Sequence, residues 1–138
     1  MTTNVCGFKL GTRTATLVIK MSRALLAGES ATFAAYLADI ESGTPTFLLA
    51  SKTINGPDPA TELRVKVQDN TKGPVIGYSE SGHARITLKY LAASAGLAVE
   101  FESHLEIAMS NSVSFPPVDQ VTDQALTLGT TVDWFVAN

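Results

Sequence analysis

Three stretches of the sequence alternate between apolar and polar residues, and this pattern constrains the fold more than any other feature. They are residues 63–68, 85–90 and 101–109. Successive side chains of a strand point to opposite faces of a sheet, so a period of two predicts half-buried strands. Alternation this clean is typical of an antiparallel sheet with one buried face and one solvated face.

Turn chemistry separates further strand candidates. Residues 4–11 and 14–20 lie on either side of a Gly-Thr-Arg turn, which predicts an N-terminal hairpin within residues 1–20. Residues 46–54 favour a strand, and the Asn-Gly-Pro-Asp-Pro run after it ends that strand. Residues 21–40 fit a helix or a strand. We therefore expect an antiparallel sheet of about five strands within residues 30–111.

The C-terminal part changes its hydrophobic period. Apolar residues fall at helical spacing after Pro117, and Thr130–Asp133 resembles a capping box that opens a second helix with Trp134 and Phe135. Two short helices are thus predicted within residues 117–137. A two-turn helix is unstable alone, so its apolar cluster must dock on a sheet. The predicted fold class is α+β, in one domain of residues 1–138.

Composition adds an expectation about partners. Of the 138 residues, 45% are hydrophobic and only 17% are charged, below the usual share of about 25%. A monomer of this composition would expose much apolar surface, so we expect another subunit to cover part of it. Cys6 is the only cysteine and excludes an internal disulfide, which favours a reducing compartment. The N-terminus does not resemble a signal peptide, and no membrane span is expected.

Charge is unevenly distributed along the chain. All ten Lys and Arg residues lie within residues 1–89, whereas residues 90–138 hold six acids and no Lys or Arg. Such asymmetry suggests a local contact with a polyanion, although chance in a chain with few charges explains it too. The net charge of −3 argues against a whole-surface nucleic-acid binder.

The sequence offers little support for an enzyme. Glu100, Glu102, His104 and Glu106 share one predicted strand face and suggest an acid–base or metal cluster. A solvated face, with these carboxylates paired across strands to Arg85 and Lys89, explains the same pattern. No phosphate-binding loop, nucleophile elbow or zinc spacing is present. We predict a non-enzyme with no catalytic residues, no metal and no cofactor.

The order of the predicted elements resembles the coat proteins of single-stranded RNA bacteriophages, the leviviruses. The Arg-Ile-Thr-Leu-Lys run of residues 85–89 is similar to the basic, Thr-containing strand on the RNA side of that sheet. The Ser-His-Leu-Glu-Ile-Ala-Met run of residues 103–109 resembles the last strand. The resemblance covers about residues 45–138.

This resemblance implies an obligate homodimer whose helices cross over onto the partner's sheet. Dimers would assemble into an icosahedral shell that packages viral single-stranded RNA, inside the cytoplasm of a bacterial host, and the mature protein would be part of the virion. Residues 92–98 would make contacts around the symmetry axes. The implied intersubunit core consists of Val118, Val121, Leu128, Trp134 and Phe135.

The resemblance also implies an RNA-binding face on the polar side of the sheet. Basic side chains would contact phosphates, while Thr87 and Gln68 would hydrogen-bond exposed bases. His104 takes the place of a base-stacking tyrosine, and Glu106 stands where the family often has Asn. The implied RNA-binding residues are Arg64, Lys66, Gln68, Arg85, Thr87, Lys89, His104 and Glu106.

Two alternatives to the coat protein remain open. One is a non-enzymatic β-rich ligand-binding or adhesin-type module, in which Trp134 and Phe135 would form an exposed platform. Their position in a predicted capped helix favours burial instead. The other is a tail or fibre component of another virus.

Overall fold

The computed structural model describes residues 2–9, 14–68, 82–108, 119–120 and 122–137, and all regular structure in these residues is β-strand. The ten strands are β1 (Thr2–Lys9), β2 (Thr14–Met21), β3 (Ser30–Ala38), β4 (Pro45–Asn55), β5 (Glu62–Gln68), β6 (His83–Ala93), β7 (Phe101–Ala108), β8 (Asp119–Gln120), β9 (Gln124–Leu126) and β10 (Thr131–Ala137).

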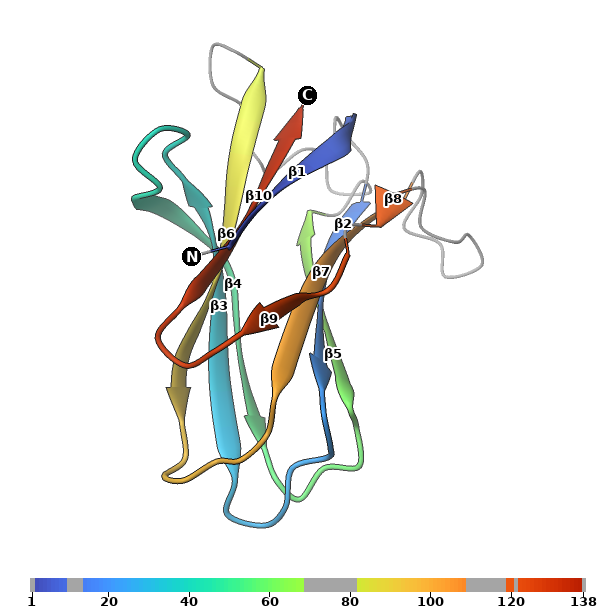
Figure 1. The fold of residues 1–138 in the computed structure, drawn as a ribbon, viewed down its shortest axis with the longest axis vertical. Coiled ribbons are helices and arrows are strands. Elements are labelled where there is room, and N and C mark those ends of the chain that lie inside the picture. Colours follow the sequence, from blue (N-terminus) through green and yellow to red (C-terminus); the bar gives the residue numbers. More distant parts are fainter. Residues whose placement is uncertain (1, 10–13, 69–81, 109–118, 121, 138) are drawn as a thin grey trace.

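The strands form two sheets. Sheet A has the order β1-β10-β6-β3-β4, and sheet B has the order β5-β2-β7-β8, with β9 pairing to another stretch of β7. All pairs are antiparallel except β1 with β10. Figure 1 shows the sheets as two layers, with the β8–β10 segment crossing from sheet B to sheet A. The protein is therefore a β-sandwich.

Side chains from both sheets meet in one core between the layers. An aromatic trio joins them: Phe33 and Tyr90 come from sheet A, and Phe101 comes from sheet B. The ring centroids lie 4.8 to 5.1 Å apart, within the range of favourable aromatic pairs. The inward-facing apolar residues predicted on β5, β6 and β7 pack in or against this core, which confirms that part of the prediction. The predicted solvated face is wrong for Arg85, Thr87 and His104, which are buried as well.

The predicted C-terminal helices are wrong, because residues 124–126 and 131–137 form β9 and β10. In β10, Val132, Trp134 and Val136 point into the core, which places three apolar side chains on one face of an extended strand. Thr130 caps no helix. Its hydroxyl donates to the Thr127 carbonyl oxygen at 2.6 Å, in a turn where Gly129 takes a φ of +82°.

The predicted N-terminal hairpin and single sheet are also wrong. β1 pairs with β10 in sheet A, whereas β2 lies between β5 and β7 in sheet B. The two strands therefore belong to different layers of the sandwich, and their partners are distant in sequence. Residues 21–40, which fit a helix or a strand, contain the strand β3.

Trp134 offers the sharpest test of this architecture. Its side chain is fully buried within its own chain, and the indole N–H has no hydrogen-bond partner. We expect Trp134→Ala to lower the free energy of unfolding by about 3–5 kcal/mol in urea denaturation. Trp134→Phe should cost less, because it keeps an aromatic ring and removes an unsatisfied donor.

The exposed Leu128 supplies the control. Leu128→Ala should change the free energy of unfolding by less than about 0.5 kcal/mol. The loss in Trp134→Ala should be the same at low and high protein concentration, because the cavity it creates lies inside one chain. A loss that grows with protein concentration would contradict burial within the chain.

Candidate functional site

The residues of the predicted RNA-binding face do not share one surface. β5 and β7 flank β2 in sheet B, whereas β6 lies in sheet A. Apart from Gln68, which lies opposite the core residue Ala15 after a register shift, the polar side chains that were predicted to bind RNA lie on the two outer faces of the sandwich. Sheet B carries Arg64, Lys66, Gln68, His104 and Glu106, and sheet A carries Arg85, Thr87 and Lys89.

On the outer face of sheet B, a buried histidine lies between two carboxylates. The His104 Nδ1 atom lies 2.5 Å from an Asp123 carboxylate oxygen, and the Nε2 atom lies 2.7 Å from a Glu106 oxygen. Lys20 pairs with Asp123 at 3.1 Å, and Arg64 pairs with Glu106. Together they form the sheet B charge network: Lys20, Asp123, His104, Glu106 and Arg64.

The carboxylates of this network have lowered pKa values. Burial raises the pKa of Glu106, but hydrogen bonds from His104 and Arg64 lower it by more. Burial likewise raises the pKa of Asp123, and hydrogen bonds from His104 and Lys20 outweigh it. Both groups therefore stay ionised at neutral pH, where they balance the neighbouring cations.

The network also covers apolar surface. Val18 lies on the outer face of β2, with Arg64 and His104 as its neighbours on the two flanking strands, yet it has no exposed surface. The ion pair between Arg64 and Glu106 bridges the strands on either side of β2. The expected partners of the β7 carboxylates, Arg85 and Lys89, are instead in the other sheet.

The network does not have the geometry of a metal site. Its two carboxylates bind opposite nitrogens of one imidazole, so the three side chains do not converge on one point. Among the described residues, no group of three His, Cys, Asp or Glu side chains is placed to hold a metal ion. Glu106 is charge-paired, as one interpretation of the β7 pattern expected, but its cation is Arg64, and the predicted solvated face and the pairing with Arg85 and Lys89 are wrong.

The outer face of sheet A holds a second polar cluster, which is buried. Arg85 donates a hydrogen bond to one Asp133 carboxylate oxygen at 2.8 Å, and the Thr87 hydroxyl donates to the other at 2.6 Å. The Asp133 side chain is only 1% exposed and that of Arg85 9%. Sequence patterns missed this cluster because its members lie 46 and 48 residues apart.

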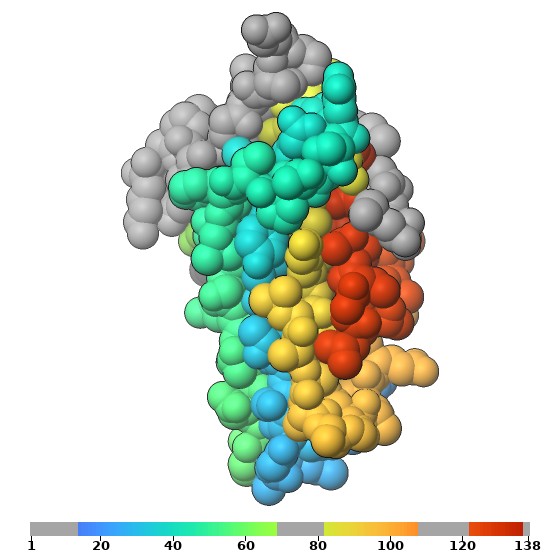
Figure 2. Space-filling model, turned by 90° about the vertical axis from the view of Figure 1, so that its left-hand side faces the viewer, coloured from blue at the N-terminus to red at the C-terminus, as the bar shows by residue number. Residues whose placement is uncertain are grey.

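The turn between β3 and β4 covers this buried cluster. Arg85 donates to the Ile40 carbonyl oxygen at 3.2 Å and lies 5.1 Å from the centre of the Phe135 ring. Gly43 has a φ of +74°, and a Cβ there would come within 2.7 Å of the guanidinium. Figure 2 shows this face, where the turn (teal) lies over the upper part of the strands. Only glycine allows so close an approach.

Burial separates the predicted RNA-binding residues into two groups. Gln68, Arg85, Thr87 and His104 are buried, and Glu106 is largely covered by the network around it. The Lys89 ammonium lies 5.6 Å from the centre of the Tyr36 ring. The two residues with exposed side chains are Arg64 and Lys66.

The predicted intersubunit core is also dispersed. Val118 and Val121 lie outside the described residues. Leu128 is 56% exposed, whereas Trp134 is buried in the core of its own chain and Phe135 is half-buried beside Arg85. The expected shelter of Trp134 on a partner subunit is therefore wrong, because β10 packs between β1 and β6 of the same chain.

Sequence reasoning also missed a cavity at the edge of the sandwich. It has a volume of about 530 Å³ and lies between the β6–β7 connection and the β9–β10 segment. The large apolar side chains that line it are those of Tyr90, Leu97, Val99, Phe101, Leu126 and Leu128. No periodic signal could reveal it, since the wall combines two sheets and two connections.

Comparisons with protein-family models, curated proteins and solved structures find no match. Within the part of the chain that the structure describes, there is no helix of the length and apolarity that a membrane span requires.

The buried Arg85–Asp133 pair yields a prediction about stability. We expect Arg85→Ala to lower the free energy of unfolding by about 3–5 kcal/mol, because it leaves the Asp133 carboxylate buried without its cation. Lys52→Ala on the exposed strand β4 is the control, with a change of less than about 0.5 kcal/mol. An Arg85→Ala variant of unchanged stability and altered RNA content would contradict this assignment.

The sheet B charge network predicts that the free energy of unfolding depends on pH in the acidic range. The pKa of Glu106 is lowered in the folded chain, so its stabilising effect is complete above the unfolded value of about 4.3 and is lost as the pH falls further. Glu106→Gln should therefore be less stable than wild type at pH 7, by roughly 1–3 kcal/mol. This difference should shrink towards pH 3 in urea denaturation. A difference that is the same at both pH values would contradict the network.

Proposed function

We propose that the protein is a non-enzymatic structural protein, a coat protein whose copies assemble with one another into a shell around RNA. The observation that carries the proposal is the exposed apolar edge of sheet A. Strand β4 exposes Phe47 and Leu48, each by about half of its surface. Among the described strands, β4 pairs with β3 alone and forms the end of its sheet.

An edge strand of this kind is suited to pairing with a second chain. Its outer side carries backbone N–H and C=O groups that can continue the sheet. Monomeric proteins commonly protect such an edge with charges, yet residues 46–51 contain none. Two copies can therefore approach without like-charge repulsion.

A two-fold axis would pair this segment with itself. We infer that residues 46–51 of two copies align antiparallel, which makes one continuous sheet of two sheets A. The contact is then self-complementary, with Phe47 and Leu48 of each copy near those of the other. This replaces the helix-mediated dimer that the sequence resemblance implies with an edge-mediated one.

RNA as cargo rests on the resemblance in residues 45–138. The ion pairs of Arg85 with Asp133 and of Arg64 with Glu106 argue against a dedicated hairpin-binding face, because these cations already have carboxylate partners. We therefore propose sequence-independent contact with packaged RNA, which depends on salt concentration. The alternative aromatic platform is not favoured, since Trp134 has no exposed surface.

The test combines light scattering after size exclusion with electron microscopy of the purified full chain. We expect particles in the megadalton range that carry RNA, detected by absorbance at 260 nm. The double variant Phe47→Lys/Leu48→Lys should give small species with an unchanged circular dichroism spectrum. A matched control is Leu26→Lys, which adds a charge at an exposed leucine outside β4 and should leave the particles intact.

Three results would overturn parts of this proposal. A wild-type chain that remains a 14.6 kDa monomer would exclude the shell. Normal particles from the double variant would exclude β4 as the assembly edge while leaving self-assembly itself in place. Particles without nucleic acid would exclude the RNA cargo.

A further inference from the structure

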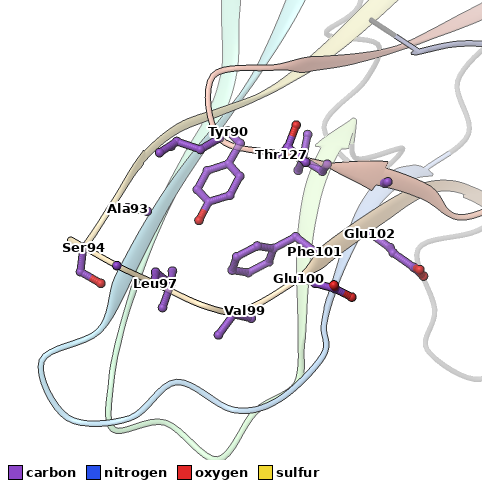
Figure 3. A pocket seen from close by; sticks show the side chains of 13 residues that line it. Tyr90, Ala93, Ser94, Leu97, Val99, Glu100, Phe101, Glu102 and Thr127 are labelled. Carbon is purple, nitrogen blue, oxygen red and sulfur yellow. The ribbon is translucent and has the colours of Figure 1, made fainter.

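The cavity at the edge of the sandwich has the size and lining of a small-molecule site. Its volume of about 530 Å³ falls in the range of known ligand pockets. Figure 3 shows the rings of Tyr90 and Phe101 entering it from β6 and β7, with Leu97 and Val99 on the connection between these strands. The cavity thus presents aromatic and aliphatic surface to an occupant.

One polar group inside the cavity lacks a partner. Tyr90 is 95% buried, and no described residue accepts a hydrogen bond from its hydroxyl. Figure 3 shows the hydroxyl oxygen directed into the cavity, on the side of Leu97 and Phe101. Burial raises the pKa of Tyr90, so the group is a hydrogen-bond donor at neutral pH. The hydroxyl is not among the fully buried side-chain atoms that lack a partner, so water reaches it in the empty cavity. An occupant that displaces this water leaves the donor unpaired unless the occupant supplies an acceptor.

The charges around the cavity exclude charged occupants. None of the lining residues is Lys, Arg or His, so an anion would lose its hydration without gaining a cation. The charged lining residues are Glu100 and Glu102, and both carboxylates lie on the side of β7 away from the two rings (Figure 3). The two carboxylates repel an anion at the rim of the cavity, but they lie too far outside it to neutralise a cation bound between the rings.

We propose that this cavity binds one small, uncharged, mainly apolar molecule that accepts a hydrogen bond from the Tyr90 hydroxyl. The site is independent of the assembly edge, since neither Phe47 nor Leu48 lines the cavity. It therefore adds a ligand-binding property to a protein whose proposed role is structural.

Equilibrium dialysis with three probes of similar shape tests the proposal. The probes are 4-acetylbiphenyl, which is uncharged and has an acceptor, biphenyl, which has none, and biphenyl-4-carboxylate, which is an anion. We expect one molecule of 4-acetylbiphenyl per chain, bound about threefold to tenfold more tightly than biphenyl. The carboxylate should bind at least about tenfold more weakly than 4-acetylbiphenyl.

Variants then assign the binding to this cavity. Tyr90→Phe should bind 4-acetylbiphenyl and biphenyl with equal affinity, because it lacks the donor and keeps the ring. Leu97→Trp fills the cavity and should abolish saturable binding. If Leu97→Trp does not fold, Ala93→Leu fills the cavity with a smaller side chain and should also abolish binding. The control Phe47→Lys/Leu48→Lys should bind as wild type does.

Three outcomes would overturn the proposal. The first is the absence of saturable binding of 4-acetylbiphenyl to the folded wild-type chain. The second is an acceptor preference that survives in Tyr90→Phe, and the third is an affinity that survives in both cavity-filling variants with wild-type melting temperatures. None of these outcomes bears on shell assembly, which is measured by particle size.

Discussion

Strand β10 lies between β1 and β6, and this placement determines most of what surrounds it. One face of the strand sends Trp134 into the core, while the opposite face brings Asp133 against Arg85 and Thr87. The chain reaches β10 through β9 and the turn at Gly129, and this segment forms one wall of the cavity. A single seven-residue strand thus links the core, a buried ion pair and a candidate ligand site.

The charged residues of the outer faces mainly neutralise one another. On sheet B, Lys20 pairs with Asp123 and Arg64 pairs with Glu106, and on sheet A the guanidinium of Arg85 is covered by a turn. These pairs stabilise the faces but leave few cations for a polyanion. The features that remain for binding are the uncharged edge of β4 and the uncharged cavity, so assembly and ligand binding would both depend on apolar contact.

The sequence predicted single strands better than their arrangement. Alternation in residues 63–68, 85–90 and 101–109 identified β5, β6 and β7 and their buried faces, because period two follows from strand geometry alone. It could not say that β6 belongs to a different sheet from β5 and β7, since that depends on long-range pairing. Asp133 contributed most to the wrong prediction of a C-terminal helix. An aspartate is unfavourable inside a strand and favourable at a helix start, and only Arg85 and Thr87 make it stable in β10.

Nuclear Overhauser contacts of Trp134 test most directly whether each chain buries its own C-terminal strand. The sample is a mixture of isotope-labelled and unlabelled chains of the Phe47→Lys/Leu48→Lys variant, so that contacts within and between chains are recorded separately. The structure predicts strand contacts between Trp134 and Ile86 within one chain, since these residues pair across β10 and β6. Contacts of Trp134 with a neighbouring chain, or a helical pattern in residues 131–137, would contradict it.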